Sequence, residues 1–100
     1  MKKKTHKVLI RGEDKPYLKD VNGYFTWLND IRVFIYYDSN WRDWYVIDLD
    51  TGQSFAQGKS MATAKIDALN NMEKLKNYKA TEKYRYKRFL YQELLKEALW

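Results

Sequence analysis

The sequence predicts an α+β domain: an antiparallel meander sheet of four to five strands followed by two C-terminal helices. Up to residue 58, short β-branched and aromatic runs alternate with Gly, Asn and Asp turns, which is typical of strands. After Gly58 the apolar residues recur at helical spacing. The length of 100 residues suits one unit, so we expect a single domain over 1–100.

The sheet is expected to span residues 7–58, after a mobile basic arm at residues 1–6. Lys7–Arg11 is short, apolar and β-branched, which predicts the first strand. Residues 12–23 hold the single proline together with many polar side chains, so we expect a loop there.

Two aromatic and β-branched runs follow, at residues 24–28 and 31–38. Between them, Asn29 and Asp30 tolerate the positive φ of a tight hairpin. Because every residue of Val33–Tyr37 is apolar, both faces of this strand should be buried, which predicts a central strand.

A polar turn at residues 39–43, which carries Trp41, precedes the next expected strand, at residues 44–49. A second turn at residues 50–52 ends in glycine, which supplies a left-handed residue. The last strand is expected at residues 53–57.

Two helices are expected after this sheet, at residues 60–78 and 81–100, and Ser60 is suited to cap the first of them. The apolar stripe expected on the first helix consists of Ala62, Ile66, Leu69, Met72 and Leu75. The apolar face expected on the second consists of Leu90, Tyr91, Leu94, Leu95, Ala98 and Leu99.

The composition excludes several classes of function. The chain has no cysteine, which excludes disulfides, thiolate metal sites and cysteine nucleophiles. Its one histidine, His6, lies in the expected arm, and no serine has a nucleophile-elbow motif around it. We therefore expect a protein that is not an enzyme and has no cofactor or metal. No apolar run is long enough for a membrane span and none follows the N-terminal lysines, so we expect no membrane contact and a cytoplasmic location.

Asp48 and Asp50 are two residues apart, so both carboxylates lie on one face of a strand, as in a magnesium site. No third ligand is identifiable, and Gly52 comes one position too early for a calcium loop. We therefore expect a plain hairpin turn here.

The strongest functional signal is Lys74–Arg88, where seven of fifteen residues are basic. Phosphate binding needs several cations in a short span, because affinity grows with the number of counterions released. Interleaved tyrosines are suited to stack on unpaired bases, with Tyr86 as an alternative to Tyr84. The other reading is a solvated helix face whose tyrosines belong partly to the core. The residues expected to contact nucleic acid are Lys76, Lys79, Lys83, Tyr84, Arg85, Lys87 and Arg88.

The middle of the chain is acidic and carries tryptophan: residues 30–50 hold five aspartates against two arginines. A tryptophan on a polar turn rimmed by charge is typical of a protein–protein hot spot. It is equally compatible with a ring that folds back over the sheet edge. The residues expected to contact a protein partner are Trp41, Asp43, Asp48 and Asp50.

The stretch Trp44–Leu75 resembles a hairpin-then-helix unit of short phage and mobile-element proteins, in which the turn leads through Gly-Lys-Ser into an alanine-rich helix. In outline it is similar to the three-stranded-sheet DNA-binding domains of integrases, whose sheet reads DNA. Here the sheet segment 30–50 is acidic, so any DNA contact would rest on the helices and the N-terminal arm. In overall character the chain resembles small phage accessory proteins, including inhibitors of bacterial defence systems such as anti-CRISPR proteins.

Two functions are expected from these observations. The first is a non-enzymatic binding protein whose basic helical face contacts nucleic acid or a nucleoprotein complex. The alternative is a phage-encoded inhibitor of a host defence nuclease, which acts by protein–protein contact through the acidic, Trp-bearing hairpins in the host cytoplasm. The helix at 81–100 is also compatible with a homodimer that pairs through Tyr91, Leu95 and Ala98.

Overall fold

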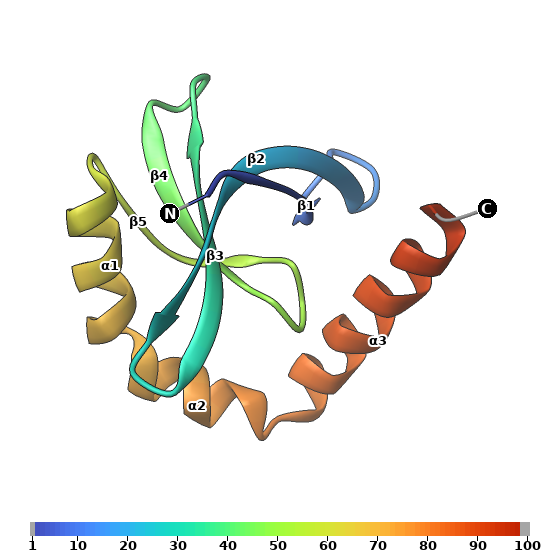
Figure 1. The fold of residues 1–100 in the computed structure, drawn as a ribbon. Helices are drawn as coiled ribbons and strands as arrows, with labels where there is room; N and C mark the ends of the chain where they lie inside the picture. The colour runs from blue at the N-terminus through green and yellow to red at the C-terminus, as the bar shows by residue number, and fades with distance from the viewer. Residues whose placement is uncertain (1, 99–100) are drawn as a thin grey trace.

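The computed structural model describes residues 2–98 and confirms the α+β fold: a five-stranded antiparallel meander is followed by three helices (Figure 1). The strands are β1 (Lys4–Ile10), β2 (Tyr17–Leu28), β3 (Ile31–Asp38), β4 (Asp43–Asp48) and β5 (Ser54–Gly58). The helices are α1 (Met61–Asn70), α2 (Met72–Lys79) and α3 (Glu82–Ala98), and they follow one another in an arc around the sheet. None of these three helices combines the length and the hydrophobicity that crossing a membrane requires.

The first hairpin is longer than the sequence predicts. Residues 17–23, expected as a loop, form the first half of β2 and pair with β1, so that prediction is wrong. The pairing begins with Lys4 opposite Gly23, which takes part of the expected mobile arm into the sheet. Exposed polar pairs line this hairpin, such as Lys7 Nζ at 2.8 Å from Asp20 Oδ1. Because these outer residues are polar, the segment has no apolar run to reveal it as a strand.

The central strand β3 is buried on both faces, as its sequence predicts. Val33 and Ile35 point into a core that the sheet shares with α1 and α2, and to which Tyr84 of α3 also belongs. Phe34 and Tyr36 point into a second cluster on the opposite face of the sheet.

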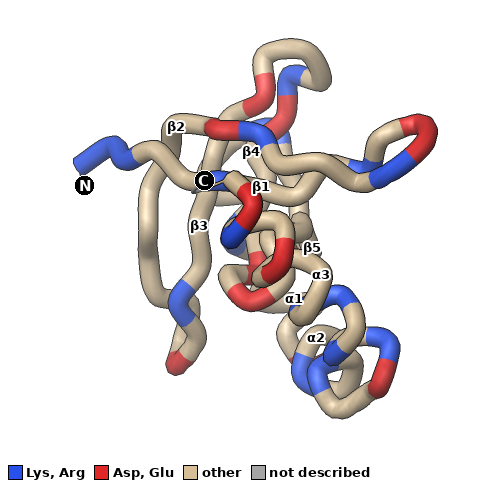
Figure 2. The backbone as a smooth tube through the Cα atoms, turned by 90° about the vertical axis from the view of Figure 1, so that its right-hand side faces the viewer, with Lys and Arg blue, Asp and Glu red and all other residues tan. Residues whose placement is uncertain are grey.

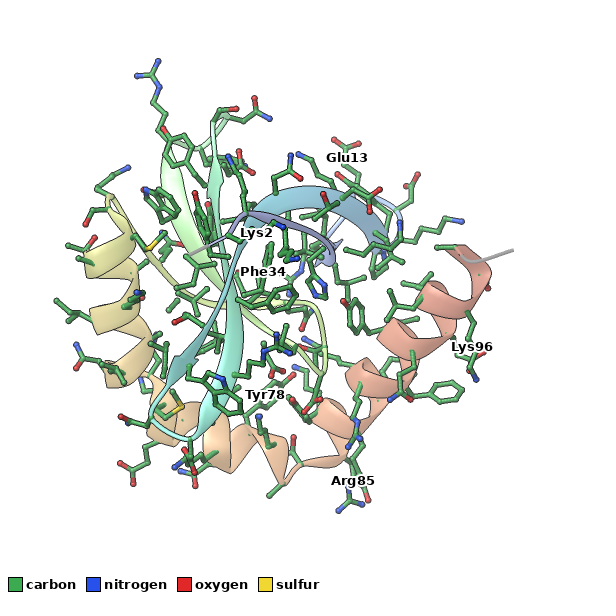
Figure 3. All side chains as sticks on the ribbon, viewed as in Figure 1. Lys2, Glu13, Phe34, Tyr78, Arg85 and Lys96 are labelled. Carbon is green, nitrogen blue, oxygen red and sulfur yellow. The ribbon has the colours of Figure 1, made fainter. Side chains whose placement is uncertain are left out.

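This second cluster lies inside the curl of the sheet. The backbone N–H of Leu9 in β1 donates to the carbonyl of Gly52 in the β4–β5 turn at 2.8 Å, so the two ends of the meander approach each other. Phe34 lies within the curl (Figure 3), and Val8 and Ile47 are buried beside it. Gly52 has φ +69°, which confirms the expected left-handed turn residue.

The single helix expected at 60–78 is two helices in the structure, divided at Asn71. Ser60 does cap α1, since its Oγ accepts the N–H of Thr63 at 3.1 Å. The expected apolar stripe is wrong in its first half, because Ile66 and Leu69 are exposed. The third residue of that half, Ala62, is exposed as well.

Two polar side chains explain why α1 presents a different face. Asp67 Oδ2 accepts the backbone N–H of Gln57 at 3.0 Å, and one turn later Asn71 Nδ2 donates to the carbonyl of Phe55 at 2.9 Å. Both partners lie on the outer edge of β5, so α1 rotates these residues towards the strand. The residues buried beneath the helix are Ala64 and Ala68. Hydrogen bonds to the edge strand and close packing by alanine thus outweigh the wider apolar stripe.

The break expected before the last helix is confirmed, because α2 ends at Lys79 and α3 begins at Glu82. Thr81 caps α3: its Oγ1 accepts the N–H of Tyr84 at 3.2 Å. The predicted helix end at residues 99–100, including the predicted core residue Leu99, lies outside the described residues.

Candidate nucleic-acid interface

Two tyrosines dock α3 onto the sheet. Tyr84 and Tyr91 are both buried, and their spacing of seven residues places them on the same face of the helix. The Tyr84 hydroxyl donates to Asp48 Oδ2 at 2.6 Å, and the Tyr91 hydroxyl donates to the carbonyl oxygen of Lys7 at 2.5 Å. These two bonds fix α3 against β4 and β1, and so determine which of its residues face outward.

The predicted turn after β4 forms the docking site for α3. Asp48 is 4% exposed and accepts hydrogen bonds from both Tyr84 and Thr51 Oγ1, the latter at 2.9 Å. Lys79 Nζ lies 3.7 Å from the other carboxylate oxygen. Burial, followed by the bonds and charges of Asp48 and Asp50, raises the pKa of the Tyr84 hydroxyl, which therefore stays protonated and donates.

Two of the predicted site residues are therefore corrected. Tyr84 was expected to contact nucleic acid and Asp48 a protein partner, but the two side chains are buried against each other. While α3 is docked, neither can reach a ligand. A position in a basic or acidic run does not reveal which way a side chain points.

The Tyr91 ring packs directly against Gly52 in the β4–β5 turn. A Cβ atom at Gly52 would lie 2.4 Å from Tyr91 Cε1, so only glycine fits beneath the ring. Burial raises the pKa of Tyr91 to about 12. The predicted homodimer face includes Tyr91 together with Leu95 and Ala98, but Tyr91 is used within the molecule. Dimerisation through this face would have to displace the contact with the sheet.

The solvent-exposed surface of α3 combines cations with aromatic rings. Tyr86 is 65% and Phe89 is 59% exposed. Arg85 and Arg88 are exposed beside them, and neither forms an ion pair within residues 2–98. Figure 3 shows Arg85 extending away from the body of the protein. We call these four residues, together with the exposed Lys83, the outer face of α3.

The remaining predicted cations are partly engaged. Lys79 lies 3.7 Å from Asp48, and Lys76 Nζ lies 3.9 Å from Asp30 Oδ1. Lys87 is half-buried, with its Nζ 5.9 Å from the centre of the Tyr78 ring. In Figure 2, the Lys and Arg positions of α2 and the start of α3 gather in one region of the molecule, opposite the N-terminus. The predicted basic segment is thus one region with two sides: the outer face of α3, and the side that carries Lys87.

The predicted protein-contact residues do not form one acidic surface. Asp43 forms a 2.8 Å ion pair with Lys59, and Asp50 Oδ2 lies 3.9 Å from Lys79 Nζ. Trp41 is different, since it is 72% exposed. Its turn is ordered by Asp38, whose Oδ1 accepts the N–H of Trp41 at 3.3 Å.

Phe89 is the residue that sequence reasoning missed. It lies three residues after Tyr86, and both lie on the side of the helix opposite Tyr84 and Tyr91. Tyr84 and Tyr91 are seven residues apart, which is typical of one buried helix face. Taking that face as the core side would have placed Tyr86 and Phe89 in solvent.

Comparisons with protein-family models, with curated proteins and with solved structures find no match to this chain.

Proposed function

We propose that this is a non-enzymatic binding protein that contacts nucleic acid, or the nucleic acid of a nucleoprotein complex, through the outer face of α3. One observation carries the proposal: exposed arginines without ion-pair partners in the described chain stand beside two exposed aromatic rings. Guanidinium groups bind phosphates with paired hydrogen bonds, and aromatic rings stack on bases.

The docking of α3 supports the same conclusion. Tyr84 and Tyr91 hold the helix to the sheet from its inner side, so the outer residues are presented on a fixed backbone. A ligand then meets side chains whose backbone is already ordered, which lowers the entropic cost of binding. A folding role does not account for Tyr86 and Phe89, because neither belongs to a core cluster formed by residues 2–98.

A fluorescence-anisotropy titration with short DNA and RNA oligonucleotides tests the proposal. The double variant Arg85→Gln/Arg88→Gln removes two charges from the outer face, and Lys15→Gln/Lys19→Gln removes two exposed charges outside the helices and the N-terminal arm as a matched control. We expect the first variant to lose roughly tenfold or more in affinity at low salt, because two phosphate contacts are removed. The control should bind like the wild type. Equal affinities for all three proteins would reject the outer face as the interface.

Trp41 favours a second candidate function, inhibition of a defence nuclease by protein contact. A tryptophan that is 72% exposed on an ordered turn has the exposure of an interface anchor. This candidate predicts that the wild type slows DNA cleavage by a purified RNA-guided nuclease and that Trp41→Ala does not. Equal inhibition by both proteins, or none by the wild type, would exclude that role for Trp41.

A further inference from the structure

Two adjoining hollows form a groove beside β5. The first, of 350 Å³, lies between β5 and α2; the second, of 420 Å³, lies between β5, the end of β1 and α3. They meet at Tyr78, which lines both. We call these two hollows the β5 groove.

The charge of the β5 groove is positive. Arg11, Lys74 and Lys87 line it, and none of the three forms an ion pair in the described part of the chain. Among the described residues that line these two hollows there is no carboxylate. Three cations in sequence along a groove complement a chain of phosphates.

Aromatic rings lie within the same groove. Phe55 and Tyr78 line the first hollow. Tyr78 is held in place by the buried Tyr84 ring, which meets it edge to face at 5.3 Å and 83°. The rings of Phe55 and Tyr78 are half-buried, so a base must enter the hollow to stack on them. Unpaired bases can do so, whereas the bases of a duplex are already stacked within it.

We propose that the β5 groove binds a single strand of nucleic acid, with phosphates beside Arg11, Lys74 and Lys87 and with bases on Phe55 and Tyr78. The inference rests on the proposed function and makes it specific. The outer face of α3 contacts phosphates of a single strand or a duplex, and the β5 groove selects the single strand.

Anisotropy titrations with labelled oligonucleotides of about eight nucleotides, single-stranded and as a duplex of the same sequence, test the inference. The groove variant is Arg11→Gln/Lys87→Gln, and Lys15→Gln/Lys19→Gln is the control with the same change of charge. We expect the wild type to prefer the single strand, the groove variant to lose roughly tenfold or more in affinity for it, and the control to lose little. Near-ultraviolet circular dichroism verifies that each variant is folded.

Phe55→Leu separates stacking from charge. We expect it to weaken single-strand binding by about fivefold or more and to leave duplex binding unchanged, because each stacked base contributes through its ring contact. Duplex preference in the wild type, or single-strand affinity unchanged in both groove variants, would overturn the inference.

The outer-face variant Arg85→Gln/Arg88→Gln distinguishes this failure from failure of the proposed function. If that variant alone loses affinity, the proposed function stands and the β5 groove is not the strand's path. If the wild type binds no oligonucleotide but binds polyglutamate through Arg11 and Lys87, both proposals fail and the groove belongs to an acidic protein segment.

Discussion

The hydroxyl group of Tyr84 donates a 2.6 Å hydrogen bond to Oδ2 of Asp48, although 36 residues separate them in the chain. This bond joins α3 to the last residue of β4 in a buried site. It also determines the outer surface, because a helix whose inner face is fixed at Tyr84 must present Arg85, Tyr86 and Phe89 to solvent. Asp48 was expected to contact a protein partner and Tyr84 to contact nucleic acid, but the two side chains form a structural contact with each other.

Removing this hydroxyl should destabilise the fold. We expect Tyr84→Phe to lower the free energy of unfolding by about 1–3 kcal/mol, because the buried carboxylate of Asp48 loses its shortest hydrogen bond. Urea denaturation measures the change. Tyr86→Phe is the matched control, since that ring is 65% exposed and the change should have little effect. Equal losses in the two variants would contradict the assigned role of Tyr84.

A methyl group at residue 52 should loosen α3. In Gly52→Ala the alanine must keep φ +69°, a left-handed conformation that costs about 1–2 kcal/mol. Its Cβ atom must also displace the Tyr91 ring. We expect a loss of stability larger than the conformational cost alone, with faster hydrogen exchange along α3. The double variant Gly52→Ala/Tyr91→Leu should recover the steric part. If the second substitution adds to the loss as an independent change would, Gly52 and Tyr91 are not coupled.

The sequence predicts the class and order of the fold because strand composition, turn residues and helical periodicity are local signals. It misses the first half of β2, whose polar side chains pair with β1 across the hairpin. It also misplaces the buried face of α1, because Asp67 and Asn71 bind the edge of β5, a contact between distant segments.

The candidate site was predictable to a similar extent. The basic run at residues 74–88 is visible in the sequence, but its division into an outer face and a groove is not. That division depends on the long-range bond of Tyr84 to Asp48. Arg11, which completes the groove, comes from the far end of the chain and has no local signal.

Stability should fall as the pH falls below the ordinary pKa of histidine. His6 is packed between Phe25 and Phe34, with ring centroids 5.3 and 5.0 Å away, and burial lowers its pKa from 6.5. Below pH 6.5 His6 therefore binds a proton more readily in the unfolded chain than in the folded chain. The stability of the fold is unaffected by His6 above pH 6.5 and decreases as the pH falls from 6.5 through the lowered pKa of the folded state. Urea unfolding at about pH 7.5 and about pH 5.5 measures the change. Because carboxylates also titrate, His6→Phe is the comparison, and an unchanged pH dependence in that variant would contradict the assignment.

The side chain of Asp67 should protect the edge strand. Its carboxylate accepts the N–H of Gln57 at 3.0 Å, so in Asp67→Ala this amide loses its hydrogen-bond partner. A loss of about 1 kcal/mol corresponds to roughly fivefold faster hydrogen exchange at Gln57. Amide exchange followed by NMR measures this rate, with Val46 in the central part of the sheet as the internal reference. Unchanged exchange at Gln57 would show that the Asp67 carboxylate does not stabilise the edge strand.

The salt dependence of nucleic-acid affinity tests the central proposal most directly. Kd for a single-stranded oligonucleotide is measured for the wild type and for Arg85→Gln/Arg88→Gln at several salt concentrations between roughly 50 and 200 mM. We expect a steep loss of wild-type affinity with salt and a slope that is shallower by about 1.4 in the variant, since each lost phosphate contact removes about 0.7. Undetectable binding at the lowest salt, or a slope that is the same in both proteins, would contradict nucleic-acid binding through the outer face of α3.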